Sequence, residues 1–434
     1  MSWQGHPSTH RAREVALVLL RHGLDSLLDL VDLRVLLPGI HHAPPGTLRA
    51  GPAHLRRAFE ELGPTFMKLG QVLSTRPDLV PPDYEAELAR LQDAAPTVPP
   101  REIAAAVESA LGRPLRETFA RFELVPIAAA SIGQVHAATL PDGSDVVVKV
   151  RRPGVIDQVN IDLDLLNRLA DIAARRSAHA ARYDPVGLAH EFGATLLGEL
   201  DYIREGRNAE VVAAGFDDDD RVHVPRVFWD YTRVDVITEE RVRGIKIDDL
   251  QTLDASGVDR ATVARTFADA YLSMVFVRGF FHADPHPGNV FVESAQRIGF
   301  VDFGMVGSVA PQASRGLGHI LLALVTRDAA RMAEGLLRLG IACEGVDRSG
   351  LERDLARFLD RYTRTPLEQL RIGPLLSDLM SVVRSHRLRL PTDLALLLKT
   401  VMMCEGVAAQ LDPGFELVPM LVPYANRLLL DGAD

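Results

Sequence analysis

Hydrophobic and polar positions alternate with a helical period over the first quarter of the chain. Segment 15–37 is rich in leucine but is interrupted by six charged or histidine side chains, a pattern typical of one or two amphipathic helices. A Pro- and Gly-containing stretch at 38–51 then separates these helices from a second helical block. In that block the apolar residues at helical spacing are Leu62, Phe66, Leu69 and Leu73.

Three polar residues, Lys68, Gln71 and Thr75, lie on the opposite face of this second helical block. Their separations of three and four residues place them side by side on one face. The spacing alone favours a solvated polar face, and it gives these residues no functional role.

The pattern changes to that of strands near residue 122. A small-residue turn at 128–134 leads into an apolar run, and an Asp-Gly turn separates that run from β-branched residues at 146–150. Two such runs around an Asp-Gly turn predict a β-hairpin, with Lys149 on its second strand.

The pattern in the rest of the chain predicts helices and strands in alternation and then helices alone. We expect a long helical region from 157 to about 214, strands at 222–228 and 234–238, and a helix at 259–277. Short strands follow at 290–292 and 298–301, and from 312 onward the pattern is almost wholly helical.

Composition restricts the class of protein. The chain has 434 residues, is 47% hydrophobic and carries a formal net charge of −10, which argues against nucleic acid as a partner. Two cysteines, Cys343 and Cys404, lack metal-ligand spacing and indicate a reducing compartment. Charges and prolines interrupt the apolar segments, so we expect no transmembrane helix and a cytoplasmic protein. Peripheral membrane contact through segment 15–37 stays an alternative, with helix packing favoured.

Candidate chemistry lies in two loops, one between the expected helix at 259–277 and the strand at 290–292, and the other after the strand at 298–301. Asp284 is followed five residues later by Asn289, and Asp302 begins an Asp-Phe-Gly triplet. Kinase-like folds use this order for phosphoryl transfer. We therefore expect Asp284 to orient the attacking hydroxyl or water, while Asn289 and Asp302 hold Mg²⁺ against nucleotide phosphates.

Lys149 precedes these loops in the order that kinases use, where a strand lysine holds the α- and β-phosphates and pairs with a helix acid. Asp201 and Glu205 are four residues apart and share a helix face, whereas Glu199 projects elsewhere. We predict that one helix serves two sites, with Glu205 facing Lys149. The alternative is a charged surface helix, which the spacing does not exclude.

Two features differ from ordinary protein kinases. The loop expected to cover the phosphates is rich in alanine, with only Gly133 near it, so it should be stiffer or grip phosphates differently. Ala283 replaces the arginine that reads a phosphorylated activation loop, and His286 stands where a lysine is usual. We expect no switching by activation-loop phosphorylation.

Further motifs resemble those of the UbiB/AarF atypical kinases, also called the ADCK family. Lys68–Gln71 resembles the family's K-x-G-Q motif, Ala128–Val135 its Ala-rich loop and Glu199–Asp201 its E-x-D motif. The resemblance runs from about Leu62 to Phe415. It implies that Lys68 meets Glu199, which replaces the solvated-face interpretation.

The resemblance implies an α+β, two-lobed, protein-kinase-like fold with a helical extension over the cleft. The expected segments are N-terminal helices and linker (1–50), K-x-G-Q extension (51–115), N-lobe (116–244) and helical C-lobe (245–434). The implied nucleotide-binding residues are Ala129, Ala130, Ser131, Gly133, Gln134, Val135, Lys149 and Glu240. The implied gating residues are Lys68, Gln71, Glu199 and Asp201.

The function that these features imply is that of an ATP- and Mg²⁺-dependent atypical kinase or ATPase. Family members are associated with isoprenoid quinone biosynthesis and lipid homeostasis, so a lipid, a quinone precursor or a membrane surface is the expected partner beside ATP. The H-x-D-x-H-P-G-N string also resembles aminoglycoside- and choline-kinase-like enzymes, which makes a small-molecule kinase an alternative. The same residues would also suit a nucleotide-sensing scaffold that transfers no phosphate, or a protein kinase.

Overall fold

The computed structural model describes residues 9–31, 33, 51–74, 76, 79–91, 97–177, 184–339, 346–362, 371–386, 388 and 391–431. The described chain is a mixture of helices and small sheets, which confirms the α+β class. It forms two compact units, Met1–Arg204 with Phe228–Glu240 (unit 1) and Glu205–Val227 with Arg241–Asp434 (unit 2). The four segment boundaries expected from the sequence stay a prediction.

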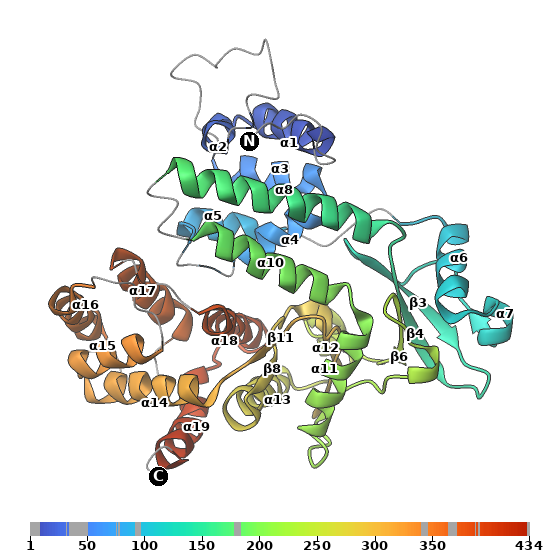
Figure 1. Ribbon diagram of the computed structural model, residues 1–434. Coiled ribbons are helices and arrows are strands. Elements are labelled where there is room, and N and C mark those ends of the chain that lie inside the picture. Colours follow the sequence, from blue (N-terminus) through green and yellow to red (C-terminus); the bar gives the residue numbers. More distant parts are fainter. Residues whose placement is uncertain are drawn as a thin grey trace. The chain divides into compact units, whose positions relative to one another are not determined.

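Most of unit 1 is a stack of helices around two apolar clusters (Figure 1). Its members are α1 (Thr9–Arg21), α2 (Asp25–Leu30), α3 (Pro52–Leu62), α4 (Pro64–Leu73), α5 (Pro82–Leu88), α8 (Val155–Arg176) and α10 (Pro185–Glu199). α8 packs along α10, and α4 contacts both of them. The predicted amphipathic helices of segment 15–37 are confirmed in part as α1 and α2, whose apolar faces are buried.

The apolar stripe from Leu62 to Leu73 is divided between two helices. Gly63 separates α3 from α4 with a φ of 94°, a left-handed conformation that favours glycine. Pro64 then begins α4, as proline does at a first helical position. Thr75 lies outside the described residues.

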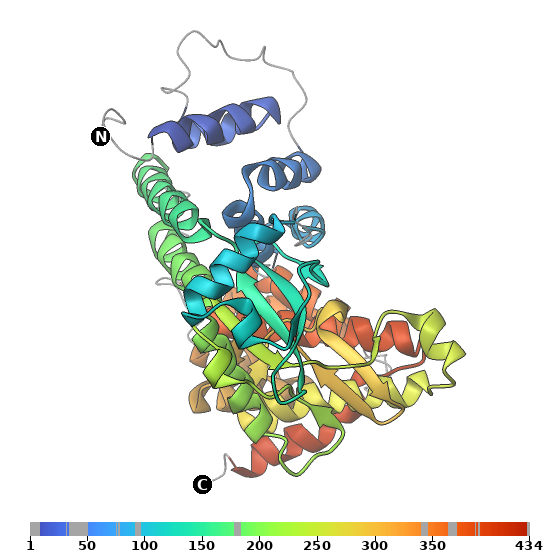
Figure 2. The ribbon, with the colours of Figure 1, turned by 90° about the vertical axis from the view of Figure 1, so that its right-hand side faces the viewer.

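An antiparallel sheet completes unit 1, with path β1-β3-β4-β6 and β2 paired to β3 (Figure 2). Its strands are β1 (Arg121–Phe122), β2 (Ala128–Ala129), β3 (Gly133–Thr139), β4 (Asp145–Arg151) and β6 (Val236–Glu240). Two short helices, α6 (Pro100–Leu111) and α7 (Leu115–Thr118), pack against it. The predicted hairpin is confirmed, because β3 and β4 pair from Gly133↔Arg151 to Thr139↔Asp145.

The region expected to be helical over 157–214 is helical where it is described, but the prediction that one helix carries both Glu199 and Glu205 is wrong. The chain forms α8, α10 and α11 (Tyr202–Ala214), and Asp201 stands between the last two helices. The Asp201 carboxylate accepts hydrogen bonds from the backbone N–H groups of Ile203 (3.0 Å) and Arg204 (3.3 Å), so it caps α11. The Tyr202 N–H donates to Val234 O at 3.1 Å, which anchors the start of the new helix to the turn that precedes β6.

Unit 2 contains two small sheets and most of the C-terminal helices. One sheet has the order β5-β10-β9-β7, and the other pairs β11 with β8. The strands are β5 (Val222–His223), β7 (Ile245–Lys246), β8 (Phe280–His282), β9 (Val290–Ser294), β10 (Arg297–Phe300) and β11 (Val306–Ser308). The helix α13 (Arg260–Ser273) lies against β10 and runs into a π-helical turn, η3 (Met274–Arg278).

The end of the chain is helical, as its pattern predicts. Beyond α12 (Leu250–Ala255), the helices are α14 (Pro311–Thr326), α15 (Ala329–Arg338), α16 (Arg348–Arg361), α17 (Ile372–Ser385), α18 (Thr392–Leu411) and α19 (Leu417–Asp431). Glu405 of α18 accepts hydrogen bonds from the N–H groups of Ile372 (2.8 Å) and Gly373 (2.7 Å). This buried carboxylate therefore caps α17 from a neighbouring helix.

One described helix, Asp393–Leu411 within α18, is long and apolar enough to cross a membrane by length and composition. Half of that window is buried inside the protein, where α18 packs against α13 and α17. We therefore describe it as a core helix of unit 2.

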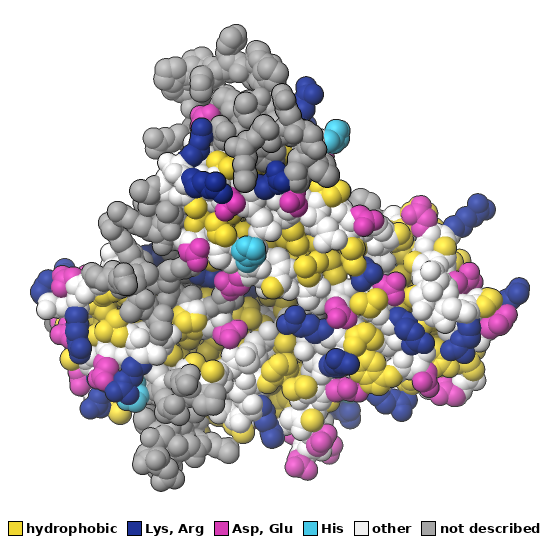
Figure 3. All heavy atoms as spheres, in the orientation of Figure 1, with side chains coloured by type: hydrophobic (Ala, Val, Ile, Leu, Met, Phe, Trp, Pro, Cys, Tyr) yellow, Lys and Arg dark blue, Asp and Glu magenta, His cyan; other side chains and the backbone are white. Residues whose placement is uncertain are grey.

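On the face drawn in Figure 3, the described acidic and basic side chains are interspersed.

Candidate active site

The K-x-G-Q and E-x-D motifs meet inside unit 1. Lys68 Nζ, on α4, lies 2.8 Å from Glu199 Oε2, at the end of α10. Both side chains are nearly buried, with 11% and 7% of their surfaces exposed. The contact between Lys68 and Glu199 that the family resemblance implies is therefore present, and Glu199 lies on a different helix from Glu205.

The other residues of the K-x-G-Q motif pack within the helical stack. A Cβ atom added at Gly70 would overlap the side chains of Leu91 and Phe59, so α4 approaches its neighbours closely only because this residue is glycine. Gln71 Nε2 donates a hydrogen bond to Leu91 O at 3.3 Å. Gly70 and Gln71 thus fix the position of α4, and with it the position of Lys68.

The Ala-rich loop joins β2 to β3 above a buried tyrosine. The Ala130 N–H donates to Gly133 O at 2.9 Å, which closes a tight turn around Ser131. A Cβ atom added at Gly133 would overlap the hydroxyl of Tyr202, whose side chain is fully buried. Close packing on Tyr202 therefore explains why this position is glycine.

Gln134 and Val135, the next two predicted nucleotide-binding residues, lie on β3. The buried Gln134 side chain accepts a hydrogen bond from the Val98 N–H, and its Nε2 lies 3.3 Å from Nε2 of His136. His136 Nδ1 donates to Glu123 O at 2.9 Å, so its Nε2 accepts from Gln134. The Gln134 side chain is occupied by these contacts, and its backbone lies in the sheet, paired with Ala129 of β2 and Val150 of β4.

Lys149 lies on β4, as predicted, opposite Val135 on β3 and Ile237 on β6. Its ammonium is 5.3 Å from the centre of the Tyr202 ring, a cation–π contact. Glu240 ends β6 opposite Val146. Tyr202 thus supports both the Ala-rich loop and the strand lysine of unit 1.

The predicted pairing of Lys149 with Glu205 stays a prediction, because the two residues belong to different units. Within unit 2, Glu205 is 2% exposed, and its Oε2 is 3.9 Å from the position that a Cβ of Gly304 would take. One turn further along α11, Asn208 Nδ2 donates to Phe303 O at 3.0 Å. The Asn208 hydrogen bond ties α11 to the Asp-Phe-Gly segment, and Glu205 lies close to Gly304 of that segment.

The catalytic-loop residues of unit 2 are held by a buried histidine. His282 Nε2 donates to Val301 O at 3.1 Å, and its Nδ1 accepts from the Asp284 N–H at 3.2 Å. Asn289 Nδ2 donates to Asp284 Oδ2 at 3.0 Å. The loop that carries Asp284 is therefore tied both to Asn289 and to the residue before Asp302.

Asn289 and Asp302 leave the β9–β10 hairpin at the same end. Val290↔Phe300 is the last pair of this hairpin, and the Val301 N–H donates to Asn289 O at 2.9 Å. Asp302 has a φ of 65°, a costly conformation for a residue other than glycine, and such strain is common at functional sites.

These two side chains fit a magnesium ion. The Asn289 amide nitrogen donates to Asp284, which leaves its oxygen as a hard donor, and Asp302 offers a carboxylate. Mg²⁺ uses one or two protein carboxylates together with phosphates and waters, so a small protein donor set suits it. Among the described residues, no group of three or more His, Cys, Asp or Glu side chains could hold a metal ion.

Sequence comparison decides the family. The ABC1 atypical kinase-like domain matches residues 90–336, and the UbiB helical domain matches residues 355–416. The chain belongs to the UbiB family of atypical kinases. Its kinase-like domain implies nucleotide binding.

Relatives in the UbiB family agree with this assignment. A Xylella fastidiosa protein named probable protein kinase UbiB is 37% identical over 96% of this chain and 78% of its own length. An uncharacterized Synechocystis protein is also 37% identical, over 86% of this chain, which spans only 64% of that relative. This UbiB-family chain is also similar to a solved structure from Mycobacterium tuberculosis, titled a complex of Rv3197 with erythromycin. The match covers 81% of this chain and 90% of the Mycobacterium chain, with a TM-score of 0.57 and 26% sequence identity.

The sequence pattern did not predict that Thr400 contacts the catalytic loop. Thr400, a fully buried residue of α18, donates to Leu396 O at 2.8 Å and lies 3.3 Å from Ala283 O. The Ala283 N–H donates to Met305 O at 3.0 Å, so the catalytic loop is held on both sides of this residue. Thr400 comes from the UbiB helical domain, 117 residues away in sequence.

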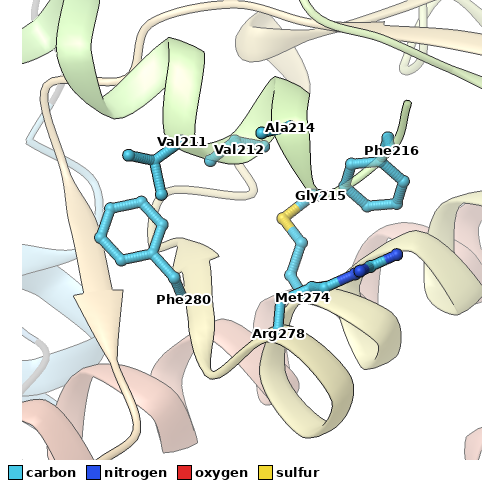
Figure 4. A pocket seen from close by; sticks show the side chains of 8 residues that line it. All are labelled: Val211, Val212, Ala214, Gly215, Phe216, Met274, Arg278 and Phe280. Atoms are coloured by element: carbon cyan, nitrogen blue, oxygen red, sulfur yellow. The ribbon is translucent and has the colours of Figure 1, made fainter.

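An apolar pocket of 260 Å³ in unit 2 lies outside this set of residues (Figure 4). Its lining residues are Val211, Val212, Ala214, Gly215, Phe216, Met274, Arg278 and Phe280. None of the predicted site residues lines it, and it offers no carboxylate for a metal. We assign it no part in phosphoryl transfer.

Proposed function

We propose that this protein is an ATP- and Mg²⁺-dependent atypical kinase or ATPase. The observation that carries the proposal is the arrangement in unit 2, where one buried histidine joins the Asp284 loop to the residue preceding Asp302. Asn289 is hydrogen-bonded to Asp284 in the same unit. Unit 1 contributes a strand lysine, Lys149, and a loop with backbone N–H groups suited to phosphates.

The residues would divide the work as follows. Lys149 would bind the α- and β-phosphates, aligned by Glu205, and Asp284 would orient a hydroxyl or water for in-line attack on the γ-phosphorus. Asn289 and Asp302 would hold Mg²⁺, which when bound neutralises charge on the phosphate oxygens. The bond from the γ-phosphorus to its bridging oxygen breaks as the bond to the attacking oxygen forms.

The gating residues would act through the helical stack. Lys68 is bound to Glu199 inside unit 1, while Gly70 and Gln71 fix α4 within that unit. Asp201 caps α11 and so sets where the helix that carries Glu205 begins. We propose that these contacts restrict which acceptors reach the nucleotide and favour a small molecule or water over a protein segment.

An ATPase assay tests the proposal. Asp284→Asn keeps the size of the side chain but removes the carboxylate that orients the nucleophile, so turnover should fall by about 10² to 10⁴. Asp360→Asn is the matched control, because Asp360 is an exposed acid on α16 in the same unit. Equal ATP consumption by the wild type and Asp284→Asn would instead support a nucleotide-sensing scaffold.

The physiological role that we propose is support of isoprenoid quinone biosynthesis or lipid homeostasis, from the cytoplasm or at a membrane surface. The 37% identity to a protein named probable protein kinase UbiB supports this direction. Adding anionic liposomes or phenolic quinone precursors to the ATPase assay should raise turnover of the wild type. If neither has an effect while small hydroxylated compounds become phosphorylated, a small-molecule kinase is favoured.

A further inference from the structure

Arg152, the first residue after β4, is bonded twice to the Ala-rich loop. Its Nε donates to Ala130 O at 2.9 Å, and its backbone N–H donates to Ile132 O at 2.9 Å. One residue therefore holds two carbonyl groups of the loop, on either side of Ser131. Because Arg152 directly follows the strand of Lys149, it also links the loop to that strand.

These bonds determine where the amide groups of the loop point. A trans peptide unit is planar, with its C=O and N–H on opposite sides, and the described residues contain no cis peptide bond. Since the carbonyls of Ala130 and Ile132 face Arg152, the N–H groups of Ser131 and Gly133 face away from it. The loop thus has a carbonyl side, which Arg152 covers, and an amide side, and amide N–H groups are suited to phosphate oxygens.

We propose that Arg152 is the positioning residue that sets the conformation of the Ala-rich loop and directs its amide side toward nucleotide phosphates. The inference rests on the proposed function, because it assumes that the loop contacts a nucleotide. In a loop with several glycines, backbone freedom allows such a conformation. Here alanines restrict the backbone, and a side chain from the adjoining strand end fixes it.

An arginine suits this role for two reasons. Its planar guanidinium presents donors in fixed directions, whereas a lysine ammonium is a point charge on a flexible stem. The side chain is also partly buried, and burial lowers the pKa of Arg152 from its ordinary value. The bond to Ala130 is thereby shielded from competing water, and its loss should be felt by the whole turn.

The experiment combines amide hydrogen exchange with nucleotide binding. Arg152→Lys keeps the charge but removes the Nε donor, and Arg152→Ala removes both. The matched control is Arg151→Lys, since Arg151 Nη1 donates to Leu200 O (2.7 Å) and Val234 O (3.3 Å), outside the loop. Exchange is measured for peptides that cover 128–135 in the absence of nucleotide, and affinities are measured for Mg-ATP and for adenosine.

We expect both Arg152 variants to raise exchange in 128–135 by about tenfold, the effect of losing one hydrogen bond to a charged donor. Mg-ATP should bind about tenfold more weakly to them, because the loop amides no longer meet the phosphates. Their affinity for adenosine should equal that of the wild type. In the Arg151→Lys control, loop exchange and Mg-ATP affinity should both stay unchanged.

Three results would overturn the inference. The first is loop exchange within twofold of the wild type in both Arg152 variants. The second is an equal rise in the Arg151→Lys control, and the third is a rise in exchange with unchanged Mg-ATP affinity. A wild-type protein that binds no nucleotide would refute the proposed function instead, while the exchange data would still show whether Arg152 holds the loop.

Discussion

The ion pair between Lys68 and Glu199 should contribute strongly to the stability of unit 1. The two charges are 2.8 Å apart, which corresponds to an attraction of about 6 kcal/mol at an effective dielectric constant of about 20. Desolvation offsets much of this attraction, because only 11% and 7% of the two side chains are exposed. Glu199→Gln removes one charge and leaves Lys68 nearly buried, so it should lower the free energy of unfolding by about 3 kcal/mol.

A double-mutant cycle isolates the pairwise interaction. Lys68→Met, Glu199→Gln and the double variant should show a coupling energy of about 2 kcal/mol, since the double variant leaves no unpaired charge. Urea unfolding followed by the fluorescence of Trp229 in unit 1 measures it, with Trp3→Phe as background because the chain has two tryptophans.

The exposed pair Arg175–Asp171, in the same unit, provides the control. Its nitrogen and oxygen are 3.1 Å apart, but the two side chains are 65% and 46% exposed. Screening by water should hold its coupling below about 0.5 kcal/mol. If the Lys68–Glu199 coupling were as small as this control, burial would not strengthen the pair and the reasoning would be refuted.

Three further predictions follow from the contacts around the site. Thr400→Val keeps the shape but removes the hydroxyl beside Ala283, so it should lower kcat several-fold at unchanged Mg-ATP affinity, while Thr400→Ser should retain activity. Gly133→Ala should place a methyl group against the Tyr202 hydroxyl, so we expect a lower Tm and weaker Mg-ATP binding. An unchanged Tm would contradict the close packing of Gly133 on Tyr202. Burial lowers the pKa of His136, so below about pH 6.5 the unfolded chain takes up its proton first. The free energy of unfolding of unit 1 should therefore decrease as the pH is lowered through that range. In His136→Gln, urea unfolding should show a smaller decrease over the same range.

Local sequence signals predicted the parts of the site that lie close together along the chain. The Asp-Gly turn fixed the β3–β4 hairpin and placed Lys149 on its second strand. Asp284 and Asn289 are five residues apart, and their hydrogen bond is formed within one loop. Such features follow from turn chemistry and short spacing, which a sequence displays directly.

Long-range contacts determine the features that the sequence did not reveal. Helical periodicity continues through residues 200 and 201, yet the Tyr202 N–H donates to Val234 O in the turn before β6, and a new helix begins there. This break places Glu199 and Glu205 on separate helices. Thr400 likewise reaches Ala283 across 117 residues, a separation at which no spacing rule applies.

The central claim is that Asp302 holds a magnesium ion against a bound nucleotide, and the affinity for ATP with Mg²⁺ and with EDTA tests it most directly. Calorimetric titration of the wild type should show binding that Mg²⁺ strengthens by at least about tenfold. Asp302→Asn should remove that gain, since it replaces the carboxylate ligand with an amide. An affinity for ATP that is the same with Mg²⁺, with EDTA and in Asp302→Asn would contradict the account.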